Sequence, residues 1–416
     1  MSASGLAPVD LAQAARMAQE ASVAGQALAP RGGNTRGWLG RPSRPDAVEI
    51  STQRLSGVLH YEPDDLTVTV QAGTGFRDLQ RQLGAHGQWL PVNPPAAAGA
   101  TIGGLLAANA CGSLRGRFGA WRDLVLGMSV ALSDGRVVKS GGRVVKNVTG
   151  YDVHKLHVGA LGTLGLIGQA SLKILPLPQE RRIVLASFAS TADAVRVACD
   201  IAGSRLEPAA VEILRGRADD PFGLRSGSMR AGAPGEWALA AAVEAGACLA
   251  VRFAGAEPCC ARGVRDVRAL VAASGGAHFA ELLAADCDAA WAALDDLPVG
   301  AGAVLRIAAT PGTAARLVSE EVAGTGGRMV ADVVSGVVHL LWDEGVGPED
   351  VVGRVERLRS GFGEAASCVL LKAPPQVRER VDVWGPRPVS YPLMLAVKRA
   401  LDPGNVWNPG RFVGEI

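Results

Sequence analysis

The hydrophobic and polar positions divide the chain into two regions of different texture. Residues 25–180 are dense in Gly, Pro and Asn between short β-like runs, whereas residues 181–375 alternate more regularly between strands and helices. Pro176 and Pro178 interrupt the pattern where the regions meet. Together with the length of 416 residues, which is long for one core, this predicts two domains.

The first region predicts an α+β arrangement. An amphipathic helix capped by Asp10 comes first, and residues 128–142 predict a hairpin that turns at Asp134-Gly135. The other predicted elements are a helix that begins after Gly73-Thr74 and stops at Gly84, and strands over 46–50, 66–73, 88–92 and 164–175.

The second region repeats an order of strands and helices, which predicts an α+β domain with an antiparallel sheet backed by helices and an internal duplication. Predicted strands cover 181–188, 209–214, 248–255, 303–309, 328–334, 337–342 and 367–373. Predicted helices cover 192–203, 261–274, 312–324 and 348–362, and residues 393–412 predict a helix followed by a turn.

Composition narrows the class of protein. Lys and Arg (42) nearly balance Asp and Glu (40), which gives no reason to expect binding to nucleic acid or a membrane surface. No apolar run approaches the ~20 residues of a membrane span, and the N-terminus lacks the pattern of a signal peptide, so we expect a cytoplasmic protein. The seven cysteines include no CxxC pair, and we expect no metal or cluster.

Three glycine-rich loops contain the residues that are best suited to bind a ligand. Paired glycines in PRGGNT (30–35) let backbone N–H groups approach a phosphate. In residues 93–112 a proline-rich approach leads to Thr101 and two glycines, which start a short helix of small residues and could cradle a pyrophosphate. Residues 147–167 place several glycines before an apolar strand. Each of these loops, taken by itself, is also explained as an ordinary turn.

Several common sites are excluded. Gly73-Thr74-Gly75 begins a dinucleotide fingerprint, but Asp78 occupies its final position, so a Rossmann fold is not supported. The chain also contains no Walker A, GxSxG or HExxH motif.

The order of five segments resembles the FAD-binding domain of the vanillyl-alcohol oxidase superfamily, also called the PCMH-type FAD-binding domain. These segments are PRGGNT, ATIGGLLAANACG, FGAWRDLVLGMSVALSDGRVV, VTGYDVHKL and GALGTLGLI, and the ending DPGNVWNPGRF fits the same superfamily. Within it, the chain resembles the FAD-binding subunits of bacterial glycolate oxidases. The resemblance implies two α+β subdomains that hold the flavin, followed by an α+β cap domain with an antiparallel sheet.

By this resemblance the domains are residues 1–178 for FAD, 179–390 for the cap and 391–416 for a segment that returns to the flavin domain. The residues implied to line FAD are Arg31, Gly32, Gly33, Asn34, Thr35, Ala100, Thr101, Gly103, Gly104, Asn109, Gly162, Ile167 and Asn408. Some relatives attach FAD covalently through a histidine where this chain has Asn34, or through a cysteine before the TIGG segment. Neither is present, which predicts non-covalent FAD.

The catalytic residues of the superfamily are only partly retained. Catalytic relatives carry a HxxDGNxH-like strand and a later EHG-like motif, whereas Asp332 stands here for the first histidine and no EHG follows. His339 remains as a weak candidate base, although a structural histidine in an apolar strand is the simpler explanation. Arg387 and Tyr391 are weak candidates for contact with an anionic substrate or a partner. His154 and His157 have a metal-compatible spacing but no third ligand.

The resemblance therefore implies an FAD-binding subunit of a complex that oxidises glycolate to glyoxylate. A catalytic flavoprotein subunit and an iron–sulfur subunit would be its partners, and these could associate it with a membrane. Two alternatives stay open. The chain could be a structural or assembly subunit with non-catalytic FAD, or a stand-alone FAD-dependent oxidase of another 2-hydroxy acid or alcohol.

Overall fold

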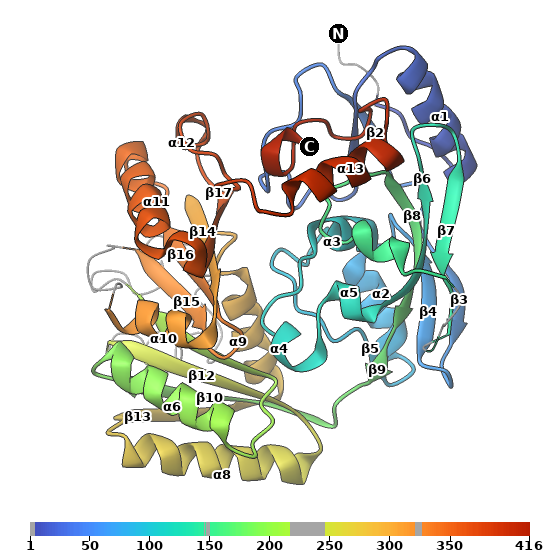
Figure 1. Cartoon of the computed structure of the whole chain (residues 1–416). Helices are drawn as coiled ribbons and strands as arrows, with labels where there is room; N and C mark the ends of the chain where they lie inside the picture. The colour runs from blue at the N-terminus through green and yellow to red at the C-terminus, as the bar shows by residue number, and fades with distance from the viewer. Residues whose placement is uncertain (1–4, 145, 147–149, 217–245, 321–326) are drawn as a thin grey trace. The chain divides into compact units, whose positions relative to one another are not determined.

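The computed structural model describes residues 5–144, 146, 150–216, 246–320 and 327–416, which form two compact units (Figure 1). Unit 1 consists of Met1–Cys111, Gly119–Leu177 and Pro386–Ile416. Unit 2 consists of Gly112–Phe118 and Pro178–Gly385. The domain limits expected from the sequence stay a prediction.

Unit 1 contains two main sheets. In the smaller one, β1 (Leu28–Arg31) pairs in parallel with β2 (Val48–Ser51). The larger is antiparallel, with the order β3-β4-β8-β6-β7. Its strands are β3 (Val58–Glu62), β4 (Thr67–Gln71), β8 (Leu166–Lys173), β6 (Val125–Ala131) and β7 (Val137–Gly141), and β5 (Gln88–Trp89) pairs separately with β9 (Leu175–Pro176).

Helices pack against these sheets through apolar faces. Asp10 caps α1 (Leu11–Val23) by accepting a hydrogen bond from Gln13 N at 2.7 Å, as predicted. Leu79 and Leu83 of α2 (Phe76–Gly84) are buried in one core with Val68 and Val70 of β4. The other helices of unit 1 are α3 (Ile102–Ala108), α5 (Trp121–Leu124), η1 (Val153–Leu156), α13 (Tyr391–Leu401) and η4 (Val413–Glu415).

Unit 2 is built around one antiparallel sheet of eight strands with the order β13-β10-β12-β11-β15-β16-β14-β17. Its first half contains β10 (Glu180–Phe188), α6 (Thr191–Gly203), β11 (Ala210–Arg215), β12 (Ala247–Gly255), α8 (Glu257–Ala273) and β13 (His278–Leu283). Its second half contains β14 (Ala303–Ala309), α10 (Pro311–Glu320), β15 (Arg328–Asp332), β16 (Val337–Trp342), α11 (Pro348–Phe362) and β17 (Ala366–Lys372). Each half has the order β-α-β-β-α-β, and the sheet orders mirror each other about β11 and β15, as the expected duplication requires.

The remaining elements of unit 2 are α9 (Ala284–Asp296) between the halves, η3 (Gly363–Ala365), α12 (Pro375–Arg378) and α4 (Arg115–Phe118). The last of these lies in the short segment Gly112–Phe118, which belongs to unit 2 although unit 1 residues flank it in sequence.

The two faces of the unit 2 sheet differ in chemistry. One face packs its alternate residues, such as Val184, Leu249 and Leu305, against α6, α8, α10 and α11 in the largest core of the protein. The strand register places ionisable residues on the other face, because side chains alternate along a strand. We call that side the polar face, and its residues are Glu212, Arg252, Arg306, Asp332 and His339.

The α+β class and the antiparallel cap sheet predicted from the sequence are confirmed, and most element limits agree within a few residues. The strand predicted over 88–92 is wrong beyond Trp89, because Pro91 has no N–H for a ladder. The helix predicted to begin after Gly73-Thr74 and to stop at Gly84 is confirmed as α2, with Gly75 as its N-cap. β1, β3, β13 and α9 were not predicted. The helix predicted over 312–324 ends within residues outside the described ones.

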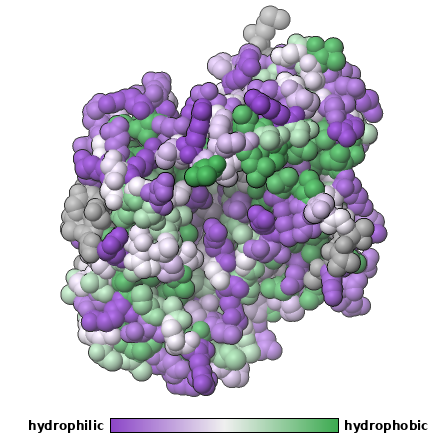
Figure 2. Space-filling view, in the orientation of Figure 1, coloured by the Kyte–Doolittle hydropathy of each residue, from purple (hydrophilic) through white to green (hydrophobic). Residues whose placement is uncertain are grey.

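The surface seen in Figure 2 mixes hydrophilic and hydrophobic residues, with apolar side chains gathered over the part of unit 1 that carries α13. Val389 and Leu393 are 97% and 68% exposed there. Among the described residues, no helix combines the length and apolar character that crossing a bilayer requires.

Candidate functional site

A hollow of about 540 Å³ opens in unit 1 where three distant parts of the chain meet. Its lining residues are Pro30, Arg31, Gly32, Gly33, Asn34, Thr35, Arg36, Gly37, Thr101, Gly104, Leu105, Ala107, Ala108, Leu161, Asn408 and Arg411.

A second hollow of about 390 Å³ shares Pro30–Gly32, Gly104, Ala107 and Leu161 with the first. The two hollows are therefore neighbouring parts of one site. The second adds Thr52, Gly103, Gly162, Gly165, Leu166 and Ile167.

The loop Gly32–Thr35 presents a run of free backbone donors to the first hollow. Within the described part of the chain, the N–H groups of Gly32, Gly33, Asn34 and Thr35 donate no hydrogen bond. Asn34 adopts a left-handed conformation, with φ of 53°. Successive free N–H groups of this kind form a concave nest for an anion, and partly buried donors without a partner are uncommon in folded proteins.

The paired glycines of this loop are required by the protein itself. A Cβ on Gly33 would lie 1.6 Å from Gly99 O, and one on Gly32 would lie 2.2 Å from Thr101 Oγ1. The sequence suggested that these glycines leave room for a ligand. The structure shows in addition that these glycines let the loop pack against residues 99–101, which brings its amides to the hollow.

The start of α3 offers fewer donors than the sequence suggested. Ile102 N donates to Thr74 O at 3.0 Å, and Gly103 N donates to Ala72 O at 2.7 Å. The expectation of free N–H groups is therefore wrong for these two residues. Gly104 N has only a long contact of 3.4 Å with Thr101 Oγ1, and Thr101 and Gly104 do line the hollow.

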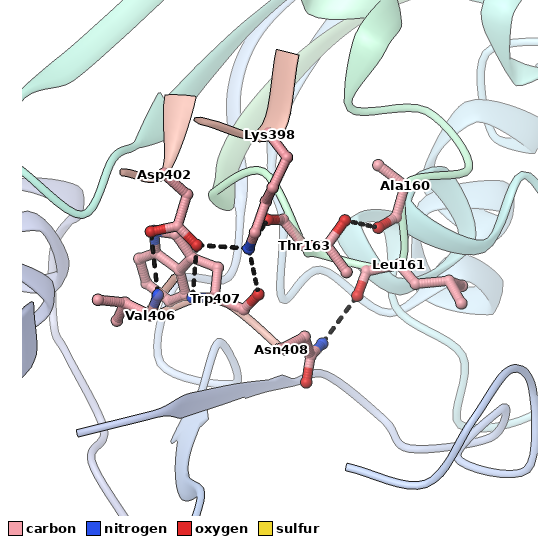
Figure 3. A network of polar contacts seen from close by, with 8 residues as sticks. All are labelled: Ala160, Leu161, Thr163, Lys398, Asp402, Val406, Trp407 and Asn408. Atoms are coloured by element: carbon pink, nitrogen blue, oxygen red, sulfur yellow. Dashed lines mark hydrogen bonds and ion pairs between the residues drawn. The ribbon is translucent and has the colours of Figure 1, made fainter. Parts of the chain in front are cut away.

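The third wall combines the loop 159–165 with the end of the chain (Figure 3). Asn408 Nδ2 donates to Leu161 O at 2.8 Å, and Asn408 N donates to Leu28 O at 2.8 Å. Leu161, Gly162 and Asn408 all have positive φ, which brings their backbones close together. The returning chain therefore forms one wall of the hollow, and that Asn408 contacts FAD stays a prediction.

Three arginines flank the first hollow. Arg31 Nε pairs with Glu49 at 3.0 Å, and Arg36 donates to Pro95 O. Arg411 donates to Ser43 Oγ at 2.8 Å and to the carbonyls of Gly37 and Leu39. These contacts hold the loop beyond Thr35 against the C-terminal segment and give the site a positive rim.

The structure brings together most residues that the sequence singled out. The exceptions are Ala100, which is buried beside the hollow, and Asn109, which forms the left-handed end of α3. Ala107 and Leu161 lie within the ranges 100–109 and 159–167, which the resemblance assigns to the flavin. Sequence reasoning missed Arg36, Gly37 and Arg411, although Arg411 stands in the quoted ending NPGRF and could have been included.

Arg387 and Tyr391 contact the C-terminus of unit 1 and not this hollow. The Arg387 guanidinium lies 4.7 Å from the centre of the Tyr391 ring, whose hydroxyl donates to Gly414 O at 2.8 Å. These contacts give both side chains a structural explanation.

The histidine pair does not form a metal site with the described residues, among which no three metal-binding side chains gather. His154 Nδ1 lies 3.1 Å from Ser140 Oγ, and His157 is buried. Burial, assisted by His154, lowers the pKa of His157 to about 4.

The polar face of unit 2 holds two groups of charges. In the first, the fully buried Arg252 lies 2.6 Å from Glu212 Oε2 and 2.8 Å from Asp295 Oδ1. Burial raises the pKa of Glu212, while Arg252 opposes that shift. These opposite charges compensate one another, so the group has a structural role.

The second group contains a cation that lacks a partner. Arg306 pairs with His339 in the strand register, and it forms no ion pair or hydrogen bond with the described residues although its Nε is buried. Burial, then Arg306 and Arg115, lowers the pKa of His339 to about 4, so its imidazole is neutral at pH 7. The nearby carboxylate, Asp332, accepts from Ser335 Oγ at 2.5 Å and from Ser335 N at 3.0 Å. Among the residues that the structure describes, Arg306 therefore has no counter-charge.

Comparison with known proteins gives a consistent result. Residues 5–141 match the family model of the FAD binding domain, and residues 177–312 match that of the C-terminal domain of FAD linked oxidases. These matches fall on units 1 and 2 respectively, apart from the short segment 112–118.

Relatives share part of their length with the chain. It is 32% identical over 188 residues to the glycolate oxidase subunit GlcD of Bacillus subtilis, covering 45% of this chain and 40% of that protein. It is 37% identical over 153 residues to the glycolate oxidase subunit GlcE of Escherichia coli, covering 36% and 43%. A mitochondrial D-lactate dehydrogenase of Arabidopsis thaliana is 34% identical over 46% of this chain and 31% of its own length. The matches thus span less than half of each relative.

Among solved structures, an alkyldihydroxyacetonephosphate synthase has a TM-score of 0.66 at 16% identity. The similarity covers 98% of this chain and 76% of the synthase. At this identity it shows a shared fold over both units.

Proposed function

Because the chain belongs to the FAD-linked oxidases and carries both of their domains, we propose that it is an FAD-binding subunit of an oxidoreductase that acts on the CH–OH group of glycolate or a similar small 2-hydroxy acid. FAD is the cofactor of this family. The observation that carries the proposal is the run of free N–H groups at Gly32–Thr35, which lines a hollow in the FAD-binding domain.

The residues of the hollow fit FAD. The diphosphate is its anionic part, and the Gly32–Thr35 amides with the arginine rim offer donors of the required sign. Gly162, Leu166 and Ile167 supply an apolar wall suited to a flat ring. Asn34 cannot form the covalent bond that a histidine forms, and Cys111 is buried with its Sγ 3.4 Å from Asn109 O, which supports non-covalent binding.

The names of two relatives support a place in a complex, since both are subunits of glycolate oxidases. We propose that the chain works beside a catalytic flavoprotein and an iron–sulfur subunit and relays electrons between them. The described residues hold no group of three metal ligands, so an iron–sulfur centre would belong to a partner. Membrane association, if the complex has it, would also come from partners.

Arg306 and His339 favour a second candidate, in which the chain oxidises a 2-hydroxy acid by itself. FAD, when bound, would supply the hydride acceptor that such chemistry needs. Within unit 2, Arg306 offers a charge for a carboxylate, and neutral His339 offers an acceptor for a hydroxyl proton. No carboxylate pairs with Arg306 among the described residues, which is the state a carboxylate site requires.

Two measurements separate these functions. The chain purified alone should be yellow and release FAD on denaturation, and a colourless preparation that cannot be reconstituted would contradict the cofactor assignment. Glycolate should then reduce a dye acceptor only when the catalytic partner is added. Turnover by the isolated chain, lost on Arg306→Met, would instead establish the second candidate.

A structural role for the flavin is tested within the complex. Replacing Gly103 and Gly104 by valine should remove FAD, because the Cβ at position 103 would lie 2.6 Å from Ala72 Cβ. We expect complex activity to be lost with the flavin. Full activity of a flavin-free complex would show that the chain serves only in assembly.

A further inference from the structure

Helix α13 buries a lysine although apolar residues are available along it. Lys398 is its buried residue, at 4% exposure, whereas Leu393 is 68% exposed. Burial lowers the pKa of Lys398, and Asp402 opposes that shift. Lysine is rarely buried without a specific set of partners, so its contacts indicate what the helix is for.

Lys398 joins three parts of unit 1 (Figure 3). Its Nζ donates to Thr163 O at 2.8 Å, to Trp407 O at 3.1 Å and to Asp402 Oδ2 at 2.6 Å, which uses all three of its protons. Asp402 also accepts from Val406 N at 3.0 Å and Trp407 N at 2.9 Å. Lys398 and Asp402 therefore hold the backbone at Thr163 and the backbone at Val406 and Trp407 in fixed positions.

Asn408 follows directly and faces the hollow. It is 4% exposed, and its Nδ2 is committed to Leu161 O. A carbonyl must face the amide nitrogen and not the amide oxygen, so this contact fixes the orientation of the side chain. Its Oδ1 points away from Leu161 in Figure 3, and this buried atom has no partner among the described residues.

A buried acceptor without a donor is costly and uncommon. We propose that Asn408 Oδ1 accepts a hydrogen bond from an N–H or O–H of FAD, and that Lys398 and Asp402 are positioning residues that act through Asn408, by holding it and its partner Leu161 for that contact. The proposal rests on FAD being the cofactor and is independent of the substrate.

The first test replaces Asn408 by glycine, which tolerates the left-handed backbone at φ of 40°. We expect Asn408→Gly to weaken FAD binding by about tenfold, the scale of one hydrogen bond. Asn405→Gly is the matched control, because Asn405 is exposed and also left-handed, at φ of 50°. The dissociation constants of FAD for the two variants, measured by flavin fluorescence titration, test this expectation. Equal affinities of the two variants would overturn the proposal.

The second test asks whether Lys398 acts through Asn408. Lys398→Met should weaken FAD binding by about tenfold, whereas Arg399→Met, its exposed neighbour, should leave it within twofold. If Lys398 only positions Asn408, the double variant Lys398→Met/Asn408→Gly binds FAD no worse than Asn408→Gly alone. Fully additive losses of about a hundredfold would show a general structural role and overturn the positioning assignment.

A measurement on the unaltered protein covers the case in which Lys398→Met does not fold. FAD binding should slow hydrogen exchange of the Trp407 and Asn408 amides by at least tenfold, because both belong to the network that Asn408 joins to the cofactor. Unchanged exchange at both amides on saturation with FAD would contradict the proposal.

Titration with FMN identifies the half of FAD that supplies the donor. Asn408→Gly lowers the affinity for both FMN and FAD if the donor lies on the isoalloxazine ring or ribityl chain, and for FAD alone if it lies on the adenosine. Either result supports an acceptor role, because the Asn405→Gly control should change neither affinity.

Discussion

The hollow of unit 1 and the polar face of unit 2 use different parts of the polypeptide to face a ligand. The hollow is lined largely by backbone and small residues, and its donors are the amides of Gly32–Thr35. The polar face uses side chains that project from neighbouring strands, such as Arg306 beside His339. Backbone donors suit a cofactor of fixed shape, whereas single charges suit a small ligand that must exchange.

The difference also shows in how charges are balanced. On the polar face, Arg252 is compensated by Glu212 and Asp295, but Arg306 has no counter-charge among the described residues. In unit 1 the buried Lys398 is compensated by Asp402. Two of these buried cations therefore stabilise structure, and the uncompensated one is where a ligand is expected.

The largest effect should come from disturbing the backbone site. Gly33→Ala places a methyl group 1.6 Å from Gly99 O, so the loop must move away from residues 99–101. We expect a loss of about 3 kcal/mol or more in stability and at least a hundredfold in FAD affinity. Denaturant unfolding and flavin titration measure both. Gly84→Ala is the control, since its methyl group meets nothing within 4 Å, and equal behaviour of the two would refute the role of this packing.

Acid should destabilise unit 1 through His157. Burial lowers its pKa from 6.5 to about 4, so between these values the unfolded chain binds a proton that the folded chain does not. Stability is therefore unaffected above pH 6.5 and falls as the pH drops from 6.5 to 4, by about 3 kcal/mol in total. Urea unfolding across this range should show the slope, and His157→Gln should reduce it, because His339, whose pKa burial also lowers, contributes to the same slope. The exposed His60→Gln should retain it.

Replacing Arg306 by a neutral residue should show whether the polar face of unit 2 and the hollow of unit 1 bind different ligands. If the polar face binds substrate, Arg306→Met raises KM for a 2-hydroxy acid by about 10- to 100-fold, which corresponds to a charged hydrogen bond of roughly 1.5–3 kcal/mol. FAD affinity should not change. Arg316→Met, on the exposed side of α10, is the control. An unchanged KM in the complex would leave Arg306 without a substrate role.

The smallest effect is expected for the ion pair between Arg117 and Glu207, at 2.5 Å, which links the segment 112–118 to the rest of unit 2. Both side chains are substantially exposed, so Arg117→Ala should cost less than about 1 kcal/mol. Thermal unfolding measures this loss. A fall in FAD affinity would show that this segment influences the hollow, contrary to the separation drawn between the regions.

Much of the fold could be predicted because its signals are local. Alternation identified most strands, Asp10 and Asp134-Gly135 marked a cap and a turn, and the repeated order of elements in unit 2 anticipated its mirrored sheet. Short elements such as β1 and β13 were missed, since too few residues carry the period and their pairing partners are distant in sequence. The candidate site followed largely from the resemblance, with Gly32–Thr35 and Asn408 as its clearest residues.

The sequence alone determined which segments are helices, strands and glycine-rich loops, because these depend on neighbours along the chain. Only the tertiary structure decided what those segments do. It showed that Gly33 is small because of Gly99, that the first amides of α3 are already bonded, and that Arg306 has no partner within the described part of the chain. It also brought Lys398 to Thr163 across more than 200 positions. Hydrogen bonds and burial of this kind join residues far apart in sequence, and no local pattern encodes them.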